Sequence, residues 1–330
     1  MKKVINNPEV VVEELLEGMV YAYPQYVEKL ENANVLVRKE KKTDKVTLVS
    51  GGGSGHEPSH GGFVGKGMLD GAVAGAVFTS PTPDQVYEAI KAVATEAGVL
   101  LVIKNYTGDV MNFDMAKELA EMDGIKVDSV IVNDDVAVQN STWTVGRRGI
   151  AGTVFVHKIA GAKAETGASL EEVKAVAEKV IANVRSMGMA LTPCIVPAAG
   201  KPNFTLAENE MEVGMGIHGE PGTHRDELKP ADEIVEHLVG RIFSDIELSG
   251  SEVAVMVNGL GATPLMELLI VNRKVHKLLE EKGIKVYKTL VGEYMTSIEM
   301  AGFSVSILKL DEELKSLLDA PADTPAYKEF

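Results

Sequence analysis

The most informative residues of this chain are 46–60, which read Val46-Thr47-Leu48-Val49-Ser50-Gly51-Gly52-Gly53-Ser54-Gly55-His56-Glu57-Pro58-Ser59-His60. The β-branched and apolar residues at 46–49 predict a strand. The glycines that follow predict a tight turn, in which the backbone can approach a ligand with no Cβ in the way. Because open α/β sheets bind ligands at the carboxyl ends of their strands, residues 51–60 predict one wall of a ligand site, with His56 as a titratable group in it.

Strand-like and helix-like segments alternate along the rest of the chain. In the first half, apolar runs predict strands at 71–77, 99–103 and 127–132, and helical spacing predicts helices at 85–97 and 111–122. In the second half, we expect strands at 253–257, 286–290 and 303–308, and helices at 230–242 and 264–281. This alternation predicts an α/β fold of two α/β domains, each with a largely parallel or mixed sheet flanked by helices.

The boundary between the two domains is expected near residue 183. A capping box that begins at Ser169 opens a predicted long helix over residues 170–187. A segment rich in proline, alanine and glycine follows that helix. We therefore expect an N-terminal domain over residues 1–183, which carries the glycine-rich substrate loop, and a C-terminal domain over residues 184–330.

Composition and charge narrow the possible functions. The 330 residues are 45% hydrophobic and 25% charged, as is typical of a globular protein with a substantial core. A net charge of −15 disfavours nucleic acid and anionic membranes as partners. The single cysteine, Cys194, excludes an intrachain disulfide and a cysteine-cluster metal site. With neither a signal-peptide pattern nor an apolar run long enough to cross a membrane, a cytoplasmic protein is expected.

Two further segments carry candidate chemistry. Lys104-Asn105-Tyr106-Thr107-Gly108-Asp109 follows the predicted strand 99–103, and in a parallel sheet it lies on the same edge as residues 51–60. The segment Glu212–Gly222 places His218 among glycines, where its ring stays accessible. A histidine in such a loop can act as a base, a nucleophile or a metal ligand.

Several familiar kinds of site do not fit these segments. Residues 51–60 lack the lysine that a P-loop requires, and Pro58 and His60 stand where a dinucleotide-binding helix should begin. His224 follows His218 by six residues with no acid cluster beside it, which is weak spacing for metal ligands. We therefore expect no metal site formed by this chain alone.

Three segments together resemble the sugar-binding K subunit of dihydroxyacetone kinase. They are Gly51–Pro58, Lys104–Asp109 and Gly214–Gly222, and the segments 146–153 and 258–261 also resemble that family. The resemblance covers essentially the whole chain, and the three motifs in this order are highly specific. It implies a two-domain α/β protein, usually a homodimer, that binds dihydroxyacetone covalently.

The resemblance also implies a role for each candidate residue. His218 would attack the C2 carbonyl of dihydroxyacetone to form a hemiaminal, and His56 would hydrogen-bond the resulting oxygen and exchange protons. Asp109 would accept the hydroxyl proton, or orient that hydroxyl, during phosphate transfer. Covalent capture selects a carbonyl over an alcohol of similar size, which packing alone does poorly. The implied substrate-binding residues are Gly53, Ser54, Gly55, His56, Lys104 and Asp109.

The phosphate must come from a nucleotide site that no segment identified above supplies. The resemblance implies a separate nucleotide-binding L subunit that holds ADP or ATP with Mg²⁺, recharged in many bacteria by a phosphoenolpyruvate-dependent phosphocarrier protein. We therefore expect no cofactor in this chain. Because phosphoryl transfer depends on in-line positioning, the active site is expected to be complete only in the complex.

Two other functions stay open. A paralogue of the kinase subunit would use His218 to capture dihydroxyacetone as a sensor and would act as a transcriptional coactivator without catalysis. The presence of both His56 and Asp109 favours the kinase subunit over that sensor. A lipid- or small-ligand-binding protein of related architecture would need an elongated apolar pocket and would have no use for His218.

Overall fold

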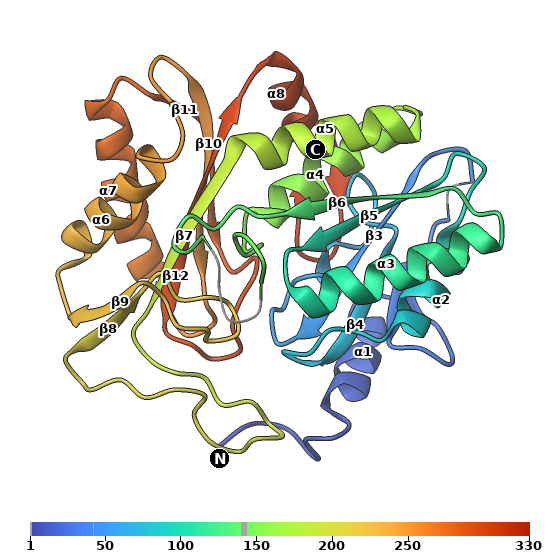
Figure 1. Cartoon of the computed structure of the whole chain (residues 1–330), viewed down its shortest axis with the longest axis horizontal. Coiled ribbons are helices and arrows are strands. Elements are labelled where there is room, and N and C mark those ends of the chain that lie inside the picture. The colour runs from blue at the N-terminus through green and yellow to red at the C-terminus, as the bar shows by residue number, and fades with distance from the viewer. Residues whose placement is uncertain (1, 42, 140–143) are drawn as a thin grey trace.

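Two six-stranded sheets stand side by side in the computed structural model, which describes residues 2–41, 43–139 and 144–330 (Figure 1). The strands of the first sheet are β1 (Val27–Lys29), β2 (Val35–Arg38), β3 (Thr47–Ser54), β4 (Gly71–Val77), β5 (Val99–Lys104) and β6 (Val127–Val132). They lie in the order β1-β2-β4-β3-β5-β6. The neighbouring strands β4, β3, β5 and β6 run parallel to one another. At one edge, β1 pairs antiparallel with β2, and β2 pairs antiparallel with β4.

The second sheet is mixed and mainly antiparallel. Its strands are β7 (Val184–Ala190), β8 (Glu210–Val213), β9 (His224–Glu227), β10 (Glu252–Gly259), β11 (Lys285–Gly292) and β12 (Gly302–Leu310). They lie in the order β11-β10-β12-β7-β8-β9, and only β10 and β11 pair in parallel. The expected α/β architecture, with two sheets that are parallel or mixed and flanked by helices, is confirmed.

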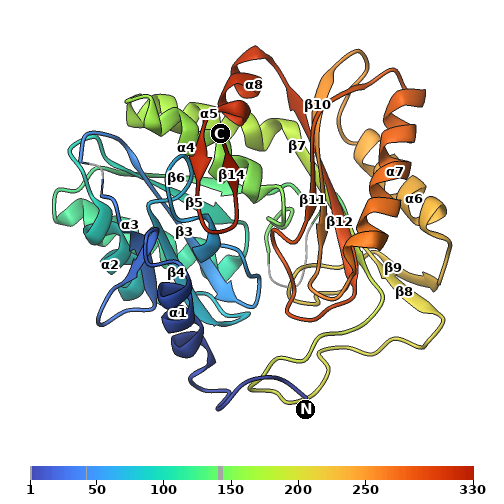
Figure 2. The same ribbon diagram turned by 180° about the vertical axis from the view of Figure 1, so that it is seen from behind.

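Helices cover both sheets and also fill the space between them. They are α1 (Val11–Ala22), α2 (Pro83–Val93), α3 (Thr107–Met122), α4 (Thr153–Glu165), α5 (Leu170–Asn183), α6 (Ala231–Phe243), α7 (Leu265–Glu281) and α8 (Glu312–Asp319). In Figures 1 and 2, α2 and α3 lie outside the first sheet, and α6 and α7 lie outside the second. The helices α4 and α5 join a core that contains residues of both sheets, such as Leu100 and Met256.

The glycine segment is the main correction to the expected local structure. The predicted turn over residues 51–60 is wrong for its first four residues, because β3 continues to Ser54. The glycines let neighbouring backbone approach this strand closely. A Cβ on Gly51 would lie 2.5 Å from the carbonyl oxygen of Val73 in β4, and one on Gly53 would lie 2.5 Å from the amide nitrogen of Thr79. The chain turns only at Gly55, where φ is +102°.

The predicted helix over 170–187 ends earlier than expected. Its capping box is confirmed, with Ser169 and Glu172 bonded reciprocally, but α5 ends at Asn183. Residues 184–190 form β7, which pairs with β12 from Val184 opposite Leu308 onward. The sheet pairing, together with burial of the apolar residues of β7, outweighs the helical pattern of this segment.

The end of the chain returns to the first half of the molecule. After α8, the short strands β13 (Ala322–Asp323) and β14 (Lys328–Glu329) form a hairpin that is drawn near the C-terminus in Figure 2. The amide nitrogen of Lys66 donates to the carbonyl oxygen of Asp323 at 3.1 Å. Tyr327 and Ala322 join the shared core. Within the described residues, no helix has the length and apolar content that crossing a membrane requires.

Candidate functional site

The candidate site lies where three parallel strands of the first sheet end. The segments that follow β3, β4 and β5 meet at one edge of the sheet, as expected for parallel strands. The loop between β8 and β9 brings His218 from the second sheet to the same edge. Together these segments line an open cavity of about 510 Å³. Its lining residues are Gly53, Phe78, Thr79, Ser80, Tyr106, Thr107, Gly108, Asp109, Asn112 and His218.

The side chain of His218 is held by Glu220. Nδ1 of His218 lies 2.8 Å from Oε1 of Glu220, and the backbone amide of His218 donates to Oε2 at 2.9 Å. A carboxylate only accepts hydrogen bonds, so Glu220 fixes the ring proton on Nδ1. In the neutral form of the ring the lone pair is therefore on Nε2, and this nitrogen is available to a substrate in the cavity that His218 lines.

Glu220 is ionised although it is buried. Its side chain is 1% exposed. Burial by itself raises the pKa of a carboxyl group, but His218 and the guanidinium of Arg148 favour the charged form more strongly and lower the pKa of Glu220 to about 2. Arg148 is in turn fixed by Asp135, whose Oδ2 lies 2.8 Å from its Nε. The negative charge behind the ring of His218 is therefore permanent at neutral pH.

His56 presents a second ring nitrogen at the site. Its Nδ1 lies 2.8 Å from the carbonyl oxygen of Thr296. Because a carbonyl accepts, Nδ1 carries the proton and Nε2 carries a lone pair. That Nε2 is buried and has no hydrogen-bond partner among the described residues. Burial, reinforced by the charge of Lys104, lowers the pKa of His56 well below its usual value, so the ring is neutral.

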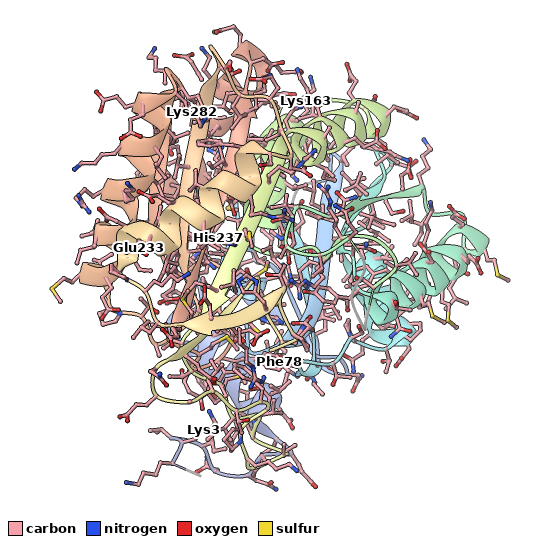
Figure 3. The ribbon with its side chains drawn as sticks, turned by 60° about the vertical axis from the view of Figure 1, so that its left-hand side comes forward. Lys3, Phe78, Lys163, Glu233, His237 and Lys282 are labelled. Carbon is pink, nitrogen blue, oxygen red and sulfur yellow. The ribbon has the colours of Figure 1, made fainter. Side chains whose placement is uncertain are left out.

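Aromatic rings position the two histidines relative to each other. The rings of His56 and His218 meet edge to face, with centroids 4.7 Å apart. Phe78, labelled in Figure 3, stacks on His56 at 5.2 Å and meets His218 edge to face. The ring of Tyr106 also meets the ring of His218 edge to face, with centroids 4.6 Å apart. Phe78 has a φ of 58°, an unfavourable conformation that costs on the order of 1–3 kcal/mol and recurs at functional sites.

Asp109 lies in the first turn of α3 and lines the cavity. Its side chain is 4% exposed, and Oδ1 accepts a hydrogen bond from the hydroxyl of Ser80. Its Oδ2 lies 3.7 Å from Nζ of Lys104, which is an ion pair without a direct hydrogen bond. The helix N-terminus beside it favours a negative charge at this position.

Lys104 is the last residue of β5 and is fully buried. It is not among the residues that line the cavity, so the structure places its ammonium behind the site rather than in it. A Cβ on Gly52 would lie 2.4 Å from Nζ, which explains why a glycine fits there. Burial lowers the pKa of Lys104, and the negative charge of Asp109 partly offsets that effect.

The structure brings together four of the residues predicted from the sequence. Gly53, Asp109 and His218 line the cavity, and the ring of His56 contacts the ring of His218 without being part of that lining. The other glycine-segment residues make contacts away from the cavity lining. The hydroxyl of Ser54 donates to the carbonyl of Gly75 at 2.8 Å. The amide of Gly55 donates to both carboxylate oxygens of Glu57 at 3.1 Å.

Several residues of the site were not predicted from the sequence. Glu220 stands two residues after His218 in the same motif, so its closeness in sequence could have indicated that it contacts His218. Tyr106 likewise stands three residues before Asp109 in a quoted motif, whereas Ser80 gave no such signal, because its place depends on how β4 ends. In the part of the chain that the structure describes, no group of three or more metal-ligating side chains is arranged to hold a metal ion.

Comparison with known proteins identifies the family. Residues 17–326 match the Dak1 domain. The chain belongs to the Dak1 family. This Dak1 chain is 56% identical to a protein of Listeria innocua named the dihydroxyacetone-binding subunit DhaK of a PTS-dependent dihydroxyacetone kinase, over 99% of this chain and 100% of that protein.

Two solved structures of similar proteins differ in function. A dihydroxyacetone kinase operon co-activator, Dha-DhaQ, is 36% identical to the Dak1 chain with a TM-score of 0.91, over 96% of this chain and 98% of that one. The dihydroxyacetone kinase of C. freundii, solved with AMP-PNP and Mg²⁺, is 35% identical with a TM-score of 0.89, over 99% of this chain but 61% of that one.

Replacing Glu220 tests whether it controls the reactivity of His218 in the Dak1 chain. Glutamine has one acceptor oxygen, so Glu220→Gln leaves either the backbone amide or Nδ1 of His218 without an acceptor. The ring proton can then move to Nε2 and block its lone pair. The family resemblance implies that dihydroxyacetone adds to His218, and we expect that addition to slow on the order of 10²-fold, less than loss of the equivalent carboxylate costs a serine protease. Stopped-flow or quenched mass spectrometry measures that rate, and an unchanged rate would contradict the role of Glu220.

Proposed function

We propose that this chain is the dihydroxyacetone-binding subunit of a dihydroxyacetone kinase, and that it holds its substrate as a covalent hemiaminal on His218. The observation that carries the proposal is the pairing of Nδ1 of His218 with the buried, ionised Glu220, which directs the lone pair of Nε2 to the cavity. Family membership and the full-length likeness to the Listeria innocua subunit support dihydroxyacetone as the substrate.

The chemistry of capture follows from the two histidines. The lone pair on Nε2 of His218 forms a bond to C2 of dihydroxyacetone, and the π electrons of the carbonyl move to its oxygen. That oxygen takes a proton from solvent and becomes a hydroxyl, while Glu220 balances the positive charge that the ring gains. The hydroxyl donates to the unpartnered Nε2 of His56. When the adduct reverts, His56 accepts the hydroxyl proton as the carbonyl re-forms.

We infer that Asp109 acts on the hydroxyl that is phosphorylated. Oδ1 is occupied by Ser80, which leaves Oδ2 to accept the proton of a terminal substrate hydroxyl. Lys104 supports this site from behind as a buried positive charge. The cavity is much larger than a three-carbon ketone, and it therefore has room for a phosphoryl group delivered from outside.

We propose that the phosphoryl group comes from a separate nucleotide-binding L subunit carrying ADP or ATP and Mg²⁺. The likeness to full-length DhaK subunits supports this, because the C. freundii kinase that was solved with AMP-PNP is matched over only 61% of its length. In the PTS-dependent relatives a phosphocarrier protein is the expected source of phosphate. The homodimer, the cytoplasmic location and the boundary near residue 183 stay predictions.

The co-activator function is the second candidate, favoured by the TM-score of 0.91 to Dha-DhaQ. Capture by His218 fits both functions, whereas Asp109 is needed only for phosphate transfer. Reconstitution distinguishes them: purified chain is mixed with an L subunit, ATP and Mg²⁺ or the phosphoenolpyruvate components, and dihydroxyacetone phosphate is measured. We expect product with the L subunit and none without it. Capture of dihydroxyacetone without product in any mixture would favour the co-activator.

A further inference from the structure

A row of buried side chains leads inward from Asp109, and its two histidines have no part in the reaction proposed above. Nζ of Lys104 lies 3.1 Å from Nε2 of His60, and Nδ1 of His60 lies 3.0 Å from Nε2 of His157. His60 follows β3, His157 belongs to α4, and both side chains are buried. We name Lys104, His60 and His157 the lysine–histidine chain.

The hydrogen bonds of the lysine–histidine chain all run in the same direction, from Lys104 through His60 to His157. An ammonium group has three N–H donors and no acceptor, so Nε2 of His60 accepts from Lys104. The proton of His60 is then on Nδ1 and is donated to Nε2 of His157. This requires two neutral rings. Burial, together with the charge of Lys104, lowers the pKa of His60 well below its usual value and that of His157 to about 3.

The acceptors around Lys104 determine how near its ammonium comes to Asp109. Nζ lies 3.2 Å from the carbonyl oxygen of Gly51 and 3.1 Å from His60, but 3.7 Å from Oδ2 of Asp109. The last distance is too long for a hydrogen bond. The other titratable groups that act on Lys104 or Asp109 come from the segment after β3, the end of β5 and α4: His56, His60, Tyr106 and His157.

We propose that His60 is a positioning residue for phosphate transfer, because by accepting from Lys104 it holds the ammonium away from Oδ2 of Asp109. That oxygen is thereby left free to accept the proton of the substrate hydroxyl. If His60 did not accept from Lys104, the ammonium could donate to Oδ2 of Asp109, which is the nearest carboxylate oxygen. That hydrogen bond would stabilise the charged carboxylate and so weaken Asp109 as a base. The inference rests on the proposed role of Asp109.

Two polar substitutions of His60 separate this role from a merely structural one. In His60→Gln, the amide oxygen can take the place of Nε2 and still accept from Lys104, while the bond to His157 is lost. In His60→Asn, the shorter amide can reach His157, but it leaves Lys104 without its acceptor. Both variants remove a buried imidazole, so they share any general loss of packing. His157→Leu is a third variant that keeps Nε2 of His60.

The variants are compared in the kinase reconstituted with its L subunit. For His60→Asn we expect kcat to fall about tenfold, because a weakened general base loses part of its usual contribution to the rate. KM and the rate of adduct formation should stay within about twofold of the wild-type values. The acid limb of the kcat–pH profile should move to lower pH. His60→Gln should keep most of the wild-type kcat, and the kcat of His157→Leu should fall less than that of His60→Asn. A crystal structure of His60→Asn should show Nζ of Lys104 within hydrogen-bond distance of Oδ2.

Equal kcat values and pH profiles for His60→Asn and His60→Gln would overturn the proposal, and so would an unmoved Lys104 in the crystal structure. If the wild-type complex is inactive, or Asp109→Asn phosphorylates normally, the proposed function fails instead. In that case the crystallographic distance still decides whether His60 positions Lys104. If His60→Asn does not fold, the kcat–pH profiles of His60→Gln and His157→Leu decide: both should keep the wild-type acid limb, and a shifted limb in His60→Gln would contradict the proposal.

Discussion

Asp109→Asn is expected to bind dihydroxyacetone covalently as well as the wild type and to lose turnover. The amide has nearly the same shape, and its oxygen can still accept from Ser80, so the cavity is preserved. It cannot take up the proton of the substrate hydroxyl. Because general-base catalysis typically contributes about 10²- to 10⁴-fold, we expect kcat in the reconstituted kinase to fall by about that factor. Coupled detection of dihydroxyacetone phosphate measures it.

Asp114 offers a matched control for this experiment. It lies on the same helix, α3, but its side chain is exposed to solvent. Asp114→Asn changes the net charge by the same amount and should leave turnover unchanged. Normal turnover in Asp109→Asn would show that Asp109 is not the base. Loss of the adduct in that variant would instead show that Asp109 is required for binding.

His218→Ala is expected to abolish the covalent adduct altogether. No other ring nitrogen combines a free lone pair with a place on the cavity lining among the described residues, since His56 is not part of that lining. Without the adduct, retention of dihydroxyacetone depends on contacts that discriminate poorly between a ketone and glycerol. We therefore expect both capture and selectivity against glycerol to be lost, as measured by mass spectrometry and by competition in the kinase assay.

His224→Ala is the control for His218→Ala. His224 begins β9, only six residues away, and is exposed. The variant His224→Ala should form the adduct as the wild type does. Circular dichroism of both variants establishes that the fold is intact. An adduct that persists in His218→Ala would assign the nucleophile to another residue.

The sequence predicted the α/β class because the apolar strands of the first sheet are buried on both faces and read as continuous runs, as at 99–103. It did not predict β7, because Val184–Met187 continues the apolar spacing of α5, and only pairing with β12 makes this segment a strand. The glycines at 51–53 were interpreted as a turn for a related reason. Their role is to admit neighbouring strands and Lys104, which are remote in sequence.

Those residues of the candidate site that are reactive side chains within recognisable sequence motifs could be predicted. His56, Asp109 and His218 stand in such motifs. The structure places Asp109 and His218 on the lining of one cavity and the ring of His56 against that of His218. The family resemblance implied that Lys104 binds substrate. Burial behind Gly52 could not be seen in the sequence. His60 and His157 lie 97 positions apart, so only the fold reveals that their rings meet.

The most direct test of covalent capture is the intact mass of the wild-type chain after incubation with dihydroxyacetone, without a reducing agent. A hemiaminal keeps the carbonyl oxygen, so the mass should rise by one whole dihydroxyacetone molecule, with no loss of water. Fragmentation should place the addition on His218. An unchanged mass, or an addition with loss of water on a lysine, would contradict the account.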